Sequence, residues 1–425
     1  MNGYFFGEFN PTAIIYDGFF TLNNGTNTLK IKGTIVNSFS YIYEIKFTGE
    51  IIDDIYNNIL NSQLLGKYTL QAGNFVGEGY LYRICGNIVF GKILREIQYE
   101  LKEMNKLTFS LVNLIPIGDK VIEEERRTYL GFSSLLFDDW SIELEKKIDY
   151  KQIYEELETH KGFANTHIGK LTNKNNENFT YKDAKVILNK LYSYLSFICG
   201  RRIFPCEIKG YNNLELVFSS YENKLIDTWS TLNTWYPKNK KEIFPELFQN
   251  FSLLWEREPW KRSKNLLLGT YFECFSHVTL ENRITNIQIA LELISKLYLV
   301  DDMKELSNRK FKGKDTTEKL EHLFISMGIN LDSLFDYIKR KNLDTDNPVE
   351  FLVKVRNSIV HPKKKVMLSY ENLSCAYHIG IWMLEMCVLR LLNYSGRYNN
   401  RLSKNKWHGD VENGGSYYNV PWLKL

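Results

Sequence analysis

The chain has 425 residues, of which 24% are charged, and its formal net charge at pH 7 is +4. This length exceeds what one hydrophobic core normally holds, so we expect two or three domains. The mild charge excludes a protein that is strongly basic overall, and any surface that binds a polyanion must be local.

Residues 1–150 carry the pattern of antiparallel β-strands. Short runs rich in Tyr, Phe, Ile and Thr alternate with Gly and Asn, as in "TLKIKGTIV" (28–36) and "EGYLYRICGNIVFG" (78–91). Alternation of this kind predicts half-buried strands joined by hairpins. We therefore expect a β-sandwich or barrel-like module, for which a sensing or regulatory role is the simplest hypothesis.

Residues 151–242 mix helical and strand-like patterns. The run "TYKDAKVILNKLYSYLSFICG" (180–200) begins with Thr180 and Asp183 at the spacing of a capping box and ends at Gly200. These features predict one helix, since a glycine commonly adopts the left-handed conformation that closes a helix. Strand-like runs follow it, so we interpret this region as a mixed α/β extension of the first module.

From residue 243 the pattern is helical. Apolar residues recur at helical intervals in "ENRITNIQIALELISKLYLV" (281–300) and in "PVEFLVKVRNSIVH" (348–361), whereas "SNRKFKGKDTT" (307–317) indicates an exposed loop. The predicted fold class is α+β and multidomain, with an N-terminal antiparallel β-rich module followed by a C-terminal all-α bundle at 243–425.

The end of the penultimate predicted helix has a concentrated positive charge. Twelve residues, 354–365, contain no acid but hold an arginine and four lysines. These are Lys354, Arg356, Lys363, Lys364 and Lys365. Such a segment would attract a polyanion such as RNA.

Arg356 and His361 are the residues of this segment that could perform chemistry. On a straight helix they would lie about 140° apart around the axis. Pro362 changes this expectation, because a residue before proline is pushed out of the α region, so His361 should lie at or beyond the last regular turn. A guanidinium can clamp a phosphate and an imidazole can transfer protons, which is what metal-independent RNA cleavage needs. The alternative is a structural role, in which the cation only complements the helix dipole and the histidine only caps carbonyl groups.

The stretch "RNSIVH" (356–361) resembles the signature of the HEPN domain, which consists of Arg, a polar residue, a short gap and His. The helix that contains "NIQIALELISKLYLV" (286–300) and the one predicted at 370–394 resemble the helices that flank this motif in ApeA-like anti-phage defence proteins. The first half of the chain resembles that family only in arrangement.

This resemblance implies a C-terminal HEPN bundle that acts as a metal-independent endoribonuclease in prokaryotic anti-phage defence, by abortive infection. Two copies of the motif would face each other across one cleft in a homodimer or a higher even-numbered oligomer. Arg356 would hold and polarise the scissile phosphate, His361 would transfer protons, and Asn357 would orient a catalytic group or the substrate. The remaining lysines, Lys354, Lys363, Lys364 and Lys365, would bind RNA, and Glu292 is an auxiliary candidate. No metal or cofactor is implied.

The substrate would be RNA, with tRNA as one candidate, and a phage-derived trigger could act on the N-terminal module. A non-catalytic protein of the same family that binds a nucleotide or RNA as a regulatory subunit is the alternative function. Six scattered cysteines without a CxxC pair indicate free thiols in a reducing cytoplasm. The first residues lack the features of a signal peptide, and we expect no membrane partner.

Overall fold

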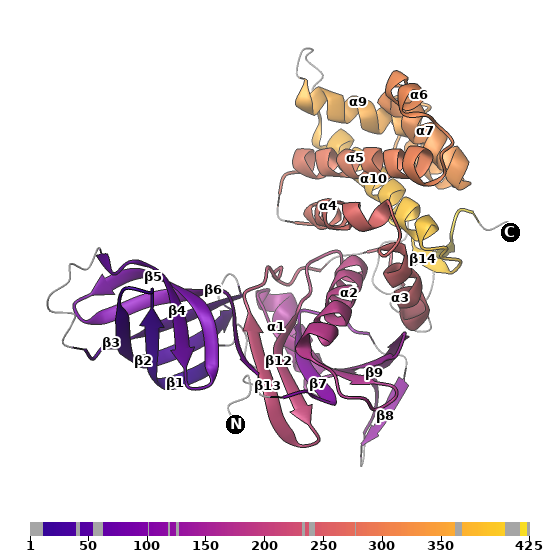
Figure 1. Cartoon of the computed structure of the whole chain (residues 1–425). Helices are drawn as coiled ribbons and strands as arrows, with labels where there is room; N and C mark the ends of the chain where they lie inside the picture. The colour runs from indigo at the N-terminus through magenta and orange to yellow at the C-terminus, as the bar shows by residue number, and fades with distance from the viewer. Residues whose placement is uncertain are drawn as a thin grey trace. The chain divides into compact units, whose positions relative to one another are not determined.

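The computed structural model describes residues 12–39, 43–53, 63–100, 102–117, 120–124, 127–231, 234–237, 243–276, 278–361, 368–403 and 417–422. The chain divides into two compact units, of which the first comprises Met1–Tyr192 and Arg202–Thr231 and the second Ser193–Arg201 and Leu232–Leu425. Strands dominate the first unit and helices the second (Figure 1).

The first unit is organised around one sheet of thirteen strands, in the order β3-β2-β1-β4-β5-β6-β13-β12-β7-β11-β10-β9-β8. Neighbouring strands pair in the antiparallel sense, as hairpin-rich sequence patterns predict. The strands are β1 (Thr12–Asn23), β2 (Thr28–Phe39), β3 (Tyr43–Ile51), β4 (Gly66–Ala72), β5 (Phe75–Cys85), β6 (Ile88–Glu100), β7 (Lys106–Val112), β8 (Lys120–Glu124), β9 (Arg127–Phe137), β10 (Trp140–Lys146), β11 (Asn165–Asn173), β12 (Pro205–Asn212) and β13 (Glu215–Glu222).

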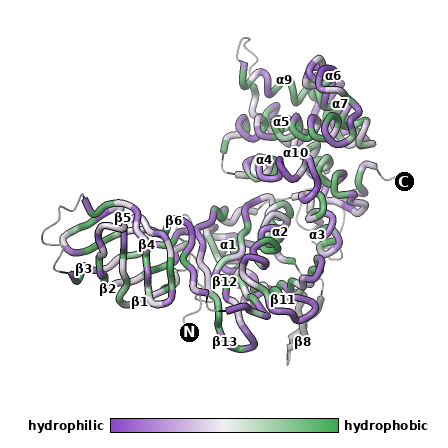
Figure 2. Tube along the Cα trace, viewed as in Figure 1, coloured by the Kyte–Doolittle hydropathy of each residue, from purple (hydrophilic) through white to green (hydrophobic). Residues whose placement is uncertain are grey.

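Strands β1–β6 close into a barrel because β3 also pairs with β6. Hydrophobic and hydrophilic residues alternate along these strands (Figure 2), and the inward set forms a buried core that includes Phe20, Phe47 and Ile93. Gly91 lies opposite this core, where an added Cβ would stand 1.9 Å from Cζ of Phe47. The barrel interior is therefore filled at this point by one aromatic ring over one glycine.

Two helices accompany the remaining strands, α1 (Tyr150–His160) and α2 (Tyr181–Cys199). The ring of Tyr181 stacks on Phe218 of β13 with 4.4 Å between centroids. Thr180 and Asp183 exchange hydrogen bonds at the start of α2, and Gly200 ends it with φ +64°. The capping pattern in the sequence predicted both ends of this helix, and both are confirmed.

The second unit is mainly helical. Its helices are α3 (Ile243–Leu254), α4 (Trp260–Glu273), α5 (Leu280–Lys296), α6 (Asn308–Gly313), α7 (Thr316–Met327), α8 (Asp332–Arg340), α9 (Pro348–Val360) and α10 (Tyr370–Leu391). A π-helical turn, Leu297–Asp302, follows α5, and two short strands, β14 (Arg397–Asn399) and β15 (Tyr417–Asn419), pair with each other.

Helix α10 forms the centre of this unit and contacts α5, α7 and α9. Gly380 allows close approach, since an added Cβ would stand 2.8 Å from Cγ2 of Ile287 on α5 and 3.1 Å from Cδ1 of Leu352 on α9. Within the part of the chain that the structure describes, α10 is also the one helix with the length and hydropathy to cross a membrane, and 83% of its most apolar window is buried inside the structure. Burial of this kind is that of a core helix.

The predicted fold class needs correction. Strands of the large sheet continue to Glu222, within the region 151–242 that we predicted as a mixed α/β extension, so this region belongs to the same sheet. The C-terminal part is not all-α, because β14 and β15 form a second sheet there. The loop predicted at 307–317 is also wrong, since Ser307 caps helix α6, and only Phe311 of that helix is buried.

Candidate functional site

Helix α9 carries the residues that the sequence singled out, and both of its ends are fixed locally. The side chain of Asn347 accepts hydrogen bonds from the backbone N–H groups of Val349, at 2.9 Å, and Glu350, at 3.2 Å, and Pro348 occupies the first turn. The helix ends at Val360, and His361 follows with non-helical angles of φ −124° and ψ 75°. The expectation that His361 lies past the last regular turn is confirmed.

The two faces of α9 have different roles. Val349, Leu352 and Val355 are buried on the inner face. Lys354 and Asn357 are exposed on the other side, and the ring of His361 is exposed at the helix end. This division places apolar residues in the bundle and polar ones at the surface.

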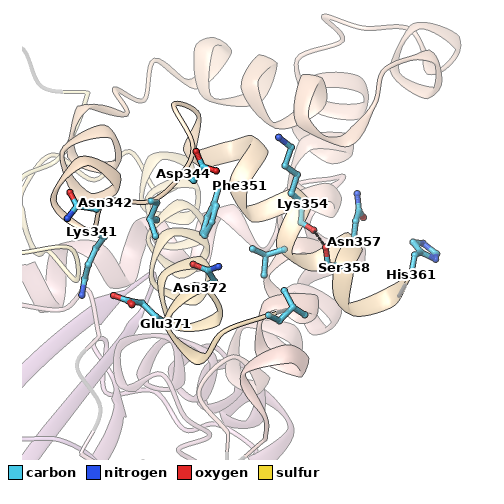
Figure 3. A pocket seen from close by; sticks show the side chains of 13 residues that line it. Lys341, Asn342, Asp344, Phe351, Lys354, Asn357, Ser358, His361, Glu371 and Asn372 are labelled. Atoms are coloured by element: carbon cyan, nitrogen blue, oxygen red, sulfur yellow. Dashed lines mark hydrogen bonds between the residues drawn. The ribbon is translucent and has the colours of Figure 1, made fainter. Parts of the chain in front are cut away.

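A pocket of about 760 Å³ lies beside this polar face (Figure 3). Its wall is formed by three segments: the residues after α8, helix α9, and the residues that lead into α10 and begin it. Lys354, Asn357, Ser358 and His361 line it from α9, and Phe351 lies between them and the other two segments in Figure 3. The volume is within the range of small-molecule sites, about 300–1,000 Å³.

The structure brings together three of the predicted site residues, Lys354, Asn357 and His361. The backbone N–H of His361 donates to the carbonyl oxygen of Asn357 at 2.8 Å, which ties the histidine to the last helical turn. Lys354 forms an ion pair with Glu350 at 2.8 Å, and its side chain is 69% exposed. An exposed pair of this kind contributes little to stability.

Arg356 is not among the residues that line the pocket. Its Nη1 donates to Oδ1 of Asn357 at 3.2 Å, so the guanidinium contacts a residue of the pocket wall. Its Nε is buried and has no hydrogen-bond partner among the described residues. Because this nitrogen is buried, a ligand could reach the guanidinium only through its terminal nitrogens, Nη1 and Nη2.

The other predicted residues lie elsewhere. Glu292 lies on α5, where its carboxylate accepts a hydrogen bond of 2.8 Å from Nε2 of Gln288, and it does not line the pocket. Lys363, Lys364 and Lys365 lie outside the described residues. In the described parts of the chain, no three His, Cys, Asp or Glu side chains are grouped so that they could hold a metal ion.

Besides Ser358 of α9, sequence reasoning missed five polar residues of the pocket, which are Lys341, Asn342, Asp344, Glu371 and Asn372. Their positions carry no catalytic signal, since polar residues just after one helix and in the first turn of another are ordinary features of helix ends. Only the folding of α8, α9 and α10 against each other brings these residues to the pocket.

Two regions of the chain match known domain families. Residues 100–232 match the family described as "YopA central domain", and residues 257–413 match the one described as "YopA C-terminal domain". The chain is also 29% identical over 429 residues to "SPbeta prophage-derived uncharacterized protein YopA" of Bacillus subtilis (strain 168), a match that covers 98% of this chain and 96% of that protein. No solved structure matches the chain.

These matches complete the correction of the fold class. The domain matched by the C-terminal part is that of YopA, and nothing in the comparisons points to the HEPN domain that the sequence motif resembled. The chain is thus similar to YopA along nearly its whole length, in both the sheet-rich and the helical unit.

Proposed function

We propose that this protein is a metal-independent endoribonuclease whose site is the edge of the α9 pocket. One observation carries the proposal: His361 and Asn357 line one pocket, and the guanidinium of Arg356 is hydrogen-bonded to Asn357. An imidazole, an amide and a guanidinium thus lie at the end of a single helix. These groups can transfer protons, orient a substrate and hold a phosphate.

The reaction needs no group beyond the RNA itself and the side chains. The ribose 2′-oxygen attacks the adjacent phosphorus, a new P–O2′ bond forms and the P–O5′ bond breaks. The 2′-hydroxyl loses its proton to one imidazole, and the 5′-oxygen gains a proton as it leaves. The products are a 2′,3′-cyclic phosphate and a 5′-hydroxyl. The guanidinium stabilises the negative charge that develops on the phosphate oxygens.

A second copy of the chain supplies what one copy lacks. The reaction requires both a proton acceptor and a proton donor, whereas each site has one His361. Arg356 also lies beside the pocket rather than in its wall. In a homodimer whose α9 ends face each other, the arginine and histidine of one copy act together with those of the other. This pairing is part of the proposal.

The experiment uses the full chain with a fluorescent single-stranded RNA in EDTA. We expect cleavage to fragments that end in a 2′,3′-cyclic phosphate. His361→Gln and Arg356→Ala should each lose activity at least about a hundredfold, since a general acid–base residue contributes about 10²–10⁴-fold and a donor to the developing negative charge about 10²–10³-fold. His322→Gln, which changes a histidine of α7 outside the pocket, is the matched control and should cleave as wild type. Cleavage that requires added metal, or that is unchanged in His361→Gln, would contradict the proposal.

RNA or nucleotide binding without cleavage is the second candidate function. It is favoured by one observation: two lysines, Lys341 and Lys354, line the pocket, whereas Arg356 does not. Retention of RNA at low salt by both wild type and His361→Gln, with the RNA left intact, would favour this function.

The biological setting is proposed by analogy. The relative in Bacillus subtilis is described as prophage-derived. A nuclease associated with a phage genome could stop growth of an infected cell after activation of the N-terminal unit by a phage-derived trigger. The six cysteines are free thiols in the structure, which supports action in the cytoplasm.

A further inference from the structure

The pocket beside α9 has two chemically different ends. Figure 3 shows Lys354, Asn357 and His361 toward one end, and Asp344 and Glu371 toward the other. The first end offers a cation, an imidazole and an amide, which suit a phosphate. The second end offers two carboxylates, which repel a phosphate. A ligand that fills the pocket must therefore be anionic at one end only.

The acidic end also carries hydrogen-bonding amides. Asn342 and Asn372 line it together with Asp344 and Glu371. The carboxylates of Asp344 and Glu371 make no hydrogen bond or ion pair with any other side chain in the described ranges. They can therefore accept hydrogen bonds from a ligand. Lys341 lies at the same end and offsets part of their charge.

Phe351 lies between the two ends and is half-buried. An aromatic ring in this position offers a face to a planar group, and stacking of a nucleic-acid base on such a ring contributes about 1–3 kcal/mol. A nucleotide has the required arrangement, with a phosphate at one end, a flat ring in the middle and hydrogen-bonding groups at the far edge.

We propose that this pocket binds one unpaired RNA nucleotide whose base carries an exocyclic amino group, and that it rejects uracil. The amino groups of cytosine, adenine and guanine donate to carboxylate oxygens such as those of Asp344 and Glu371. Uracil presents a carbonyl oxygen at the corresponding position and would face a negative charge. This inference deepens the proposed function and rests on it, because it takes RNA as the substrate of the same site.

The test compares the affinities for CMP and UMP. CMP carries an amino group where UMP carries a carbonyl oxygen. Binding to the full chain is measured by titration calorimetry, without any cleavage. We expect CMP to bind at least about tenfold more tightly than UMP, because a well-placed base contact discriminates by about 1–3 kcal/mol. In the double variant Asp344→Asn with Glu371→Gln, the ratio should fall toward one. Both residues are exposed, so the variants should remain folded.

Asp336→Asn is the matched control, since this exposed acid lies on α8 outside the pocket, and it should keep the wild-type ratio. Equal affinity for CMP and UMP, or no binding of either at millimolar concentration, would overturn the inference. The two proposals fail separately. Selective CMP binding by a protein that never cleaves RNA would refute the nuclease and keep the base pocket, whereas cleavage without selective binding would do the reverse.

Discussion

Glu385 is expected to be the polar residue on which the second unit depends most strongly. It is 1% exposed in the middle of α10, and its carboxylate accepts hydrogen bonds from Nε and Nη2 of Arg401 at 2.6 and 2.7 Å. The hydroxyl of Tyr271 and the backbone N–H of Trp235 donate to the same carboxylate at 3.2 and 3.3 Å. One side chain thus joins three segments of the unit.

Glu385→Ala would leave Arg401 buried without its counter-charge. Burial by itself lowers the pKa of Arg401, but the charge and hydrogen bonds of Glu385 outweigh this effect and hold that pKa above its ordinary value. Arg401 stays protonated even when the carboxylate is removed, because a guanidinium is not deprotonated in proteins. Loss of one partner of a buried pair costs about 3–5 kcal/mol. At about 2–4 °C per kcal/mol, this corresponds to a decrease in Tm of roughly 6–20 °C.

The assay is thermal unfolding of the full chain followed by tryptophan fluorescence, since Trp235 and Trp382 are fully buried in this unit. Asp336→Ala, at an exposed position of α8, is the control and should change the Tm by less than about 2 °C. Glu385→Leu combined with Arg401→Met should be more stable than Glu385→Ala, because it removes both charges. If Glu385→Ala has the same Tm as the Asp336→Ala control, the ion pair contributes little to stability and the expected decrease in Tm is refuted.

Three further predictions follow from other parts of the structure. Gly380→Ala should lower the free energy of unfolding by about 1–3 kcal/mol in denaturant titration, because the new methyl group would overlap Ile287 and crowd Leu352. Gly269→Ala should be neutral or stabilising, because no atom outside its own stretch of helix lies within 4 Å of the added Cβ. Equal effects of the two substitutions would contradict the packing of α10. Burial first, and then the charge of Lys146, lower the pKa of His167 to about 3, so stability should be full above pH 6.5 and fall toward pH 3, by up to about 1.4 kcal/mol per pH unit. In His167→Gln, the free energy of unfolding measured by urea titration should depend less steeply on pH between pH 4 and 7. An unchanged slope would show that His167 does not cause the pH dependence. Finally, a mixture of Arg356→Ala and His361→Gln chains should cleave RNA better than either variant alone if two copies share a site, and activity no higher than that of the separate variants would argue against a shared site.

Local signals in the sequence were sufficient to predict helix boundaries where a single residue type controls the backbone. Gly200 predicted the end of α2, and the structure places Pro348, the first residue of the helical pattern at 348–361, in the first turn of α9. The short helix α6 escaped prediction because it buries only Phe311, so it has no apolar periodicity, although Ser307 at its N-cap was a readable signal.

The pocket and the buried ion pair could not be predicted from local patterns. Asp344 and Glu371 are 27 positions apart and line one pocket only through the packing of α8, α9 and α10. Glu385 lies within an apolar run, and its partner Arg401 follows a short strand, so neither residue signals the other in the sequence. Contacts of this kind depend on the tertiary arrangement, which residue spacing along one helix does not encode.

Replacement of a single ribose tests the central claim most directly. An RNA oligonucleotide with one cleavage site is compared with the same oligonucleotide that carries a 2′-deoxy sugar on the 5′ side of the scissile phosphate, both in EDTA with wild-type protein. The account predicts that the all-ribose strand is cut to a 2′,3′-cyclic phosphate and that the deoxy substitution abolishes cleavage at that bond. Equal cleavage of both strands would mean that water attacks the phosphate and would contradict the account, as would intact RNA in both samples.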